Sequence, residues 1–200
     1  MPRETNSHSD LLYEAYLAVG TMGFRLSERF DSSWGDTWTR YVQVSGLSAL
    51  EEVIGLDCSL CPCLIDELGE DDWRHTVYAE HLFGVFDDPD YLLGLCPNRN
   101  RKSAQLLALA REPSEEDVER FQEKGFAFKG YELIEEATCI SALTNCRGFE
   151  KAFKGTELSA CGLIPNHSRA YEVRRLLREH YPDELRADCN VWAIWRREDD

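Results

Sequence analysis

The chain has 200 residues, 43% of them hydrophobic and 30% charged, which is enough apolar material for one folded domain with a core. This composition excludes a disordered chain, and no apolar run has the roughly 18 residues of a membrane span. Residues 1–10 lack the apolar core of a signal peptide, so we expect a cytoplasmic protein without membrane association. In that compartment the eight cysteines should be thiols or metal ligands and not disulfides.

The formal net charge of −15 is concentrated in one part of the chain. Residues 51–90, called the acidic segment below, hold twelve acidic residues against Arg74 alone and so carry −11. General nucleic-acid binding is not expected, because phosphate contacts need a basic surface. Two interpretations remain, a solvated surface that favours solubility and a patch that faces a basic partner.

The first half of the chain begins with a flexible tail at 1–10 and mixes strand and helix patterns. Alternating apolar residues predict the strands, and Ser, Asp, Pro and Gly at fixed offsets predict the helices. The expected elements are strands at 13–20 and 37–45 and helices at 48–55, 61–69 and 71–78.

The second half has longer apolar runs. Gly130 should mark a break or bulge in the strand expected at 125–143. The strand expected at 189–195 is apolar on both parities, as a strand covered on both faces would be. Residues 198–200 should fray. The expected elements are a helix starting at Asp88-Pro89, strands at 103–111, 125–143 and 189–195, and helices at 114–125 and 166–182.

The helix at 166–182 has the clearest pattern. Asn166 can cap it and Pro182 ends it. Beside its apolar stripe lie three arginines, which are more typical of a solvated face than of an anion site. The stripe consists of Ala170, Val173, Leu176, Leu177 and His180, and the arginines are Arg174, Arg175 and Arg178, next to Tyr171.

Because strands and helices do not alternate strictly and several links are short, we predict a single α+β domain over residues 11–197. It should hold a mainly antiparallel sheet of about five strands, several short helices and one longer C-terminal amphipathic helix, which packs on the sheet through Val173 and Leu177. The expected core strand residues are Leu17, Val19, Val42, Val44, Leu107, Leu133, Val191 and Ile194.

Three cysteines, Cys58, Cys61 and Cys63, form a C-x-x-C-x-C pattern inside the acidic segment. A zinc site needs four ligands and commonly two such pairs, whereas only one pair is present. The fourth ligand would have to come from His75, His81 or Cys96. Cys61-Pro62 also fits a helix start with cysteines packed as small apolar residues, so we expect no metal and no cofactor.

A second thiol, Cys146, follows a predicted strand and precedes a possible helix near Gly148. The helix dipole and Arg147 could activate it as a nucleophile, with His167 or His180 as base. Nothing in the spacing brings either histidine to Cys146, and turn chemistry explains its neighbours without catalysis.

These features favour a binding protein over an enzyme. We expect the acidic segment to engage a basic protein partner, as an inhibitor- or immunity-type protein would, and the oligomeric state stays open. The alternative is a metal-binding or cysteine-dependent enzyme that uses Cys58, Cys61, Cys63 and His75, or Cys146. The expected partner-binding residues are Asp66, Glu67, Asp71, Asp72, Trp73 and Tyr78.

The cysteine cluster gives a first testable prediction. Elemental analysis of protein purified without chelator should find much less than one zinc or iron ion per chain. One tightly bound ion per chain that disappears in the Cys58→Ser/Cys61→Ser variant would show instead that the cluster is a metal centre.

Overall fold

The computed structural model describes residues 15–20, 76–80, 83–86, 104–119, 125–135, 141–143 and 149–198. Side chains are described only within the part from Leu107 to Glu198. The elements predicted at 37–45, 48–55 and 61–69 therefore lie outside the described residues, as do Val42 and Val44.

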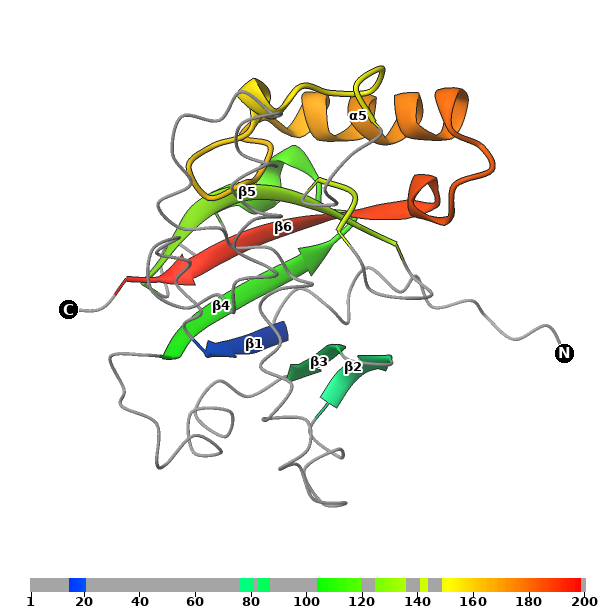
Figure 1. The fold of residues 1–200 in the computed structure, drawn as a ribbon. Helices are drawn as coiled ribbons and strands as arrows, with labels where there is room; N and C mark the ends of the chain where they lie inside the picture. Colours follow the sequence, from blue (N-terminus) through cyan, green and yellow to red (C-terminus); the bar gives the residue numbers. More distant parts are fainter. Residues whose placement is uncertain are drawn as a thin grey trace, which may run out of the picture.

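One sheet organises the molecule, with every neighbouring pair of strands antiparallel. In spatial order the strands are β2-β3-β1-β4-β6-β5, so β2 and β5 are its two ends (Figure 1). A mixed α+β architecture with antiparallel strands agrees with the prediction from sequence. The strands are β1 (Ala15–Gly20), β2 (Thr76–Glu80), β3 (Phe83–Phe86), β4 (Ala104–Arg111), β5 (Phe126–Glu135) and β6 (Cys189–Arg197).

Strand β6 lies between β4 and β5, and side chains on both of its faces are buried. Val191 and Trp195 belong to the core under the long helix, whereas Trp192 and Ile194 alternate with them on the opposite face. This agrees with the apolar pattern on both parities. Four predicted core residues are 0% exposed in strands, namely Leu107, Leu133, Val191 and Ile194.

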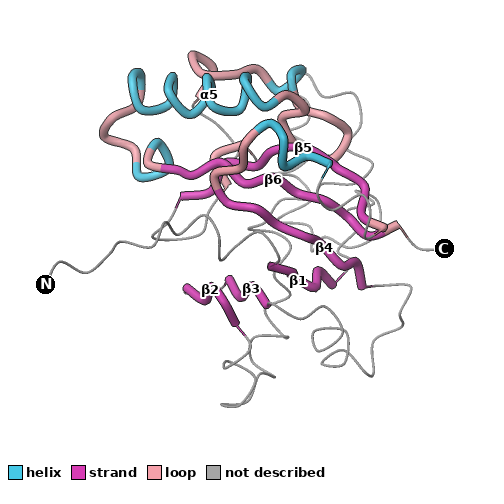
Figure 2. Tube along the Cα trace, turned by 180° about the vertical axis from the view of Figure 1, so that it is seen from behind, coloured by secondary structure: helices cyan, strands magenta, loops and turns pink. Residues whose placement is uncertain are grey.

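Helix α5 (His167–His180) begins one residue after Asn166, whose side-chain oxygen accepts a hydrogen bond from Arg169 N at 3.0 Å. It runs alongside β5 and β6 (Figures 1 and 2) and buries Ala170, Val173 and Leu177 in their core cluster. The stripe is narrower than predicted, because His180 is exposed.

Three short 3₁₀ helices complete the described part: η3 (Glu115–Glu119), η5 (Gly155–Glu157) and η6 (Leu185–Ala187). No helix among the residues that the structure describes is long and apolar enough to cross a membrane.

Two helix predictions need correction. The helix expected at 71–78 is wrong over its last residues, because Thr76–Glu80 form β2 and pair with β3. Thr, Val and Tyr favour a pleated strand once a neighbouring strand is available, and pairing across the sheet outweighs the capping signal. The helix expected at 114–125 is described only as far as residue 119, where it is the short 3₁₀ helix η3 and not an α-helix. Both Ser114 N and Ser114 Oγ donate to Asp117 Oδ2 at its start.

Gly130 sits at the expected irregularity of β5, where the register with β6 shifts between Phe128 and Gly130. Its φ of 139° is a conformation that side chains disfavour. A Cβ added there would lie 2.7 Å from the Cβ of Leu163 and 3.0 Å from the carbonyl oxygen of Ile164. The missing side chain of Gly130 therefore lets the segment with Leu163 and Ile164 approach β5 closely.

Gly130→Ala should lower the free energy of unfolding by about 2–4 kcal/mol, because strain in the backbone and a clash with Leu163 add together. Gly125→Ala is the matched control, since Gly125 also has positive φ, at 81°, but nothing within 4 Å of an added Cβ. It should cost only about 1 kcal/mol in urea-induced unfolding. Equal costs for the two variants would show that the close approach at Gly130 is not tight.

Candidate functional site

The residues that the sequence pointed to fall mainly outside the described part of the chain. Tyr78 lies in β2, opposite Val85 of β3, and its side chain is not described. The partner-binding and cysteine predictions therefore remain predictions. Residues outside the described ranges are Asp66, Glu67, Asp71, Asp72, Trp73, Cys58, Cys61, Cys63, His75 and Cys146.

Two strands of the acidic segment are described, and both lie at one end of the sheet. β2 is the end strand and β3 separates it from β1. Helix α5 packs on β5 and β6 toward the opposite end (Figure 1). These strands of the acidic segment are thus separated from α5 by β1 and β4.

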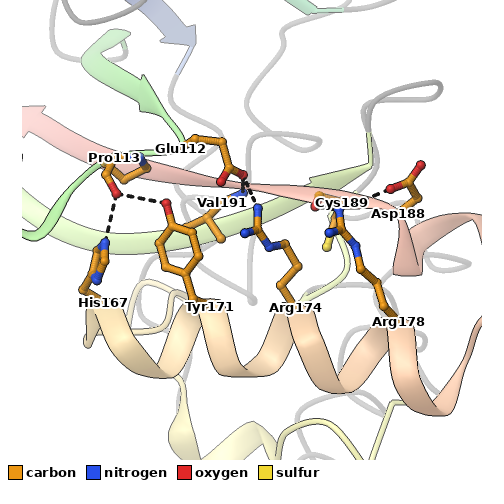
Figure 3. Close-up of polar contacts among 9 residues, drawn as sticks. All are labelled: Glu112, Pro113, His167, Tyr171, Arg174, Arg178, Asp188, Cys189 and Val191. Carbon is orange, nitrogen blue, oxygen red and sulfur yellow. Dashed lines mark hydrogen bonds and ion pairs between the residues drawn. The ribbon is translucent and has the colours of Figure 1, made fainter. Parts of the chain in front are cut away.

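A continuous set of polar contacts lies between α5 and the sheet, and we call it the polar seam (Figure 3). Its four helix residues are His167, Tyr171, Arg174 and Arg178, at i, i+4, i+7 and i+11. This spacing places them in one row beside the buried Ala170, Val173 and Leu177. The row faces Glu112 and Pro113 after β4, and Asp188 to Val191 at the start of β6.

Glu112 is the centre of the polar seam. Its N–H donates to Val191 O at 2.7 Å, and its Oε1 accepts from Val191 N at 2.8 Å and from Arg174 Nη1. Its φ of 49° is left-handed, which costs a non-glycine residue about 1 kcal/mol or more. The three hydrogen bonds offset this strain and join the end of β4, β6 and α5 at one residue.

Pro113 O accepts two side-chain hydrogen bonds from α5, from Tyr171 Oη and from His167 Nε2, both at 2.9 Å. A carbonyl oxygen only accepts, so His167 must carry a hydrogen on Nε2. The guanidinium of Arg174 lies 4.7 Å from the centre of the Tyr171 ring and completes the packing.

Two tyrosines near the start of α5 are held in their neutral form. Burial, with Glu112 nearby, raises the pKa of Tyr171 above its usual range. Burial, with the charges of Glu115 and Asp117, raises the pKa of Tyr131 to about 12. The Tyr131 hydroxyl is buried and has no hydrogen-bond partner among the residues that the structure describes.

At the other end of the seam, Arg178 donates to Asp188 Oδ1 and to Cys189 O, each at 3.2 Å. Burial raises the pKa of the Cys189 thiol to about 12, although Arg178 and Arg174 oppose that shift. A neutral thiol is a poor nucleophile, and Cys189 is buried in the core cluster. Its role is therefore that of an apolar core residue.

The arginines of α5 are all engaged with acids. Arg175 pairs with Glu179 at 2.6 Å, and Arg169 pairs with Glu157 and Glu172. These contacts explain the arginine face without an anion ligand. The guanidinium of Arg169 also lowers the pKa of Glu157 through a direct hydrogen bond.

A fully buried carboxylate, Glu132, lies on the sheet face opposite α5 and is 0% exposed. Its Oε1 accepts hydrogen bonds from Ser141 Oγ at 2.7 Å and from Leu133 N at 2.9 Å. Glu132 thereby ties residues 141–143 to the outer side of β5, where Ser141 forms a bridge with Ile134.

The groups of the polar seam satisfy one another's hydrogen-bonding capacity and hold α5 against the sheet, which is a structural role. Within the described ranges, no three His, Cys, Asp or Glu residues come together as a metal site would require. Sequence reasoning missed Glu112 because 62 residues separate it from Arg174. The four-residue polar row beside the apolar stripe was the one available signal.

In comparisons with known proteins, no family model, no curated protein and no solved structure matches this chain.

The Glu112–Arg174 pair should show a coupling energy of about 1–2 kcal/mol in a double-mutant cycle with alanine, because their side chains are only 34% and 19% exposed. Arg175 and Glu179 form the matched control. Their side chains are 62% and 55% exposed, and such a helix pair is worth about 0.3–0.5 kcal/mol. Equal coupling in both cycles would remove Glu112 from its central role.

Removing the hydroxyls of Tyr171 and Tyr131 should have different effects on the free energy of unfolding. Tyr171→Phe loses the hydrogen bond to Pro113 O and should cost about 1 kcal/mol at neutral pH. Tyr131→Phe should be neutral or stabilise by up to about 1 kcal/mol, because it removes a buried hydroxyl without a described partner. A clear loss of stability in Tyr131→Phe would contradict this.

Tyr131→Phe should also change how the free energy of unfolding depends on pH above pH 10. Because burial disfavours the ionised phenol, ionisation of Tyr131 costs nothing below the unfolded pKa of 10.0, and the fold loses stability as pH rises from there toward about 12. Urea unfolding measured at intervals over that range should therefore show a shallower decline for Tyr131→Phe than for the parent protein. An unchanged slope would mean that Tyr131 titrates normally in the fold.

Proposed function

We propose that the protein is a cytoplasmic binding protein whose acidic segment engages a basic macromolecular partner, as an inhibitor- or immunity-type protein does. In this proposal a single α+β domain carries the segment, with its sheet and the C-terminal helix α5 as the rigid scaffold. Expected contact residues are the six already named, Asp66, Glu67, Asp71, Asp72, Trp73 and Tyr78.

The observation that carries the proposal is the uneven distribution of charge. The acidic segment holds −11 of the formal −15, which leaves −4 for the other 160 residues. Charge that serves solubility alone has no reason to concentrate in one fifth of the chain. A cleft or face of one sign attracts a partner of the opposite sign and raises the rate of association.

Two structural features support the proposal. Strands β2 and β3 form the end of the sheet that is remote from α5, a position in which neighbouring acids can face outward from the domain. Each arginine of α5 is paired with an acid that lies outside the acidic segment. Aromatic residues such as Trp73 and Tyr78 would supply the apolar contacts that hold a complex together once charge has steered it.

The test starts by isolating a partner with the tagged protein from its native cells and then measures the association rate with the purified partner. Asp66, Glu67, Asp71 and Asp72 are changed together to lysine. The rate should fall at least about tenfold in this variant, and the parent rate should fall as salt rises from about 0.1 M to about 1 M, where the Debye length shrinks from about 10 Å to about 3 Å.

The control variant changes four exposed acids elsewhere, Glu116, Glu150, Asp183 and Glu184, to lysine. It alters the net charge equally but leaves the acidic segment intact, so it should associate at nearly the parent rate. Equal slowing by both variants would show that net charge alone acts. A partner that is indifferent to salt and to the acidic segment would overturn the proposal.

A further inference from the structure

One end strand of the sheet, β5, has its outer edge covered by other parts of the chain. β5 is bridged on its outer side at two points, Tyr131 with Ile164 and Ile134 with Ser141. The first bridge includes hydrogen bonds in both directions, at 2.8 Å and 3.0 Å, and Ala142 N donates to Leu133 O at the second. The chain thus covers this edge with its own backbone, which is how folded proteins prevent unwanted strand pairing.

The other end of the sheet is β2. Within the described ranges β2 pairs with β3 alone, so one row of its backbone N–H and C=O groups points away from the sheet. Its sequence, Thr-Val-Tyr-Ala-Glu, contains neither the lysine nor the proline that commonly blocks an edge strand. Thr, Val and Tyr are also residues that favour strand pairing.

Charge determines which strand would be accepted at this edge. Glu80 lies in β2 itself, and β2 belongs to the acidic segment with its charge of −11. A second copy of the chain would bring the same negative segment and be repelled. An extended segment rich in lysine or arginine would gain both backbone hydrogen bonds and opposite charge.

We propose that the outer edge of β2 binds an extended basic segment of the partner protein by adding it to the sheet as a further strand. This inference rests on the proposed function and specifies its geometry. Backbone hydrogen bonds to residues 76–80 would supply the pairing, and the acids of the segment would select basic side chains on the added strand.

The test uses two synthetic peptides of equal charge with the full-length protein. The first alternates lysine and valine over seven residues, with four lysines, and can form a strand. In the second, proline replaces each valine, which keeps the charge but removes the N–H groups at those positions. Affinity is measured by fluorescence anisotropy, and amide hydrogen exchange is followed over residues 76–80.

Strand addition predicts that the valine peptide binds at least about tenfold more tightly than the proline peptide and slows exchange of alternate amides in β2. If both peptides bind equally and both lose affinity when Asp66, Glu67, Asp71 and Asp72 are changed to lysine, strand addition is wrong but the proposed function survives. If neither binds, or if binding ignores that variant, both are wrong. Full protection of every β2 amide before peptide is added would show that the chain itself covers this edge.

Discussion

The pairing of β6 with both β4 and β5 is the constraint on which the described structure depends. Cys189–Arg197 form the middle strand of β4-β6-β5, so β4 and β5 cannot join the same sheet until these residues are in place. The strand is buried on both faces, and its aromatic and aliphatic residues supply much of the hydrophobic stabilisation there. Helix α5 precedes β6 in the chain, with the short helix η6 between them, and it covers one of these faces. This packing places the helix side of the polar seam against the start of β6.

The polar seam solves a problem that arises where β4 ends. Pro113 cannot continue a hydrogen-bonded ladder, and Glu112 turns the chain through a left-handed conformation. The Glu112 carboxylate then takes the place of a further strand residue by accepting from Val191 N, while Arg174 holds that carboxylate from the helix side. His167 and Tyr171 fix Pro113 O, and Trp195 Nε1 donates to Val118 O, so the chain leaving β4 is held through its backbone.

Charged residues are arranged differently in two parts of the chain. Near α5, acids and arginines are paired with one another over the helix and the adjoining loops, where they stabilise packing. In the acidic segment twelve acids face a single arginine, so their charge stays uncompensated within that stretch of sequence. A packed region and a segment of strong uniform charge in one chain fit the binding function that we propose, which needs a charged surface on a rigid support.

The sequence by itself determined the pattern-driven features: the strand segments that became β1, β4 and β6, the cap of α5 at Asn166, the bulge at Gly130 and the core positions Leu107, Leu133, Val191 and Ile194. These follow from local periodicity and backbone preference, which neighbouring residues encode. The strand predicted at 125–143 is too long, because β5 ends at Glu135 and Ser141 returns to form a bridge with Ile134. Tertiary structure alone decided the strand order, the strand at Thr76–Glu80 where capping signals favoured a helix, and the Glu112–Arg174 contact. The reason is physical: strand pairing and ion pairs join residues far apart in the chain, and their free energy exists only once the fold has brought them together.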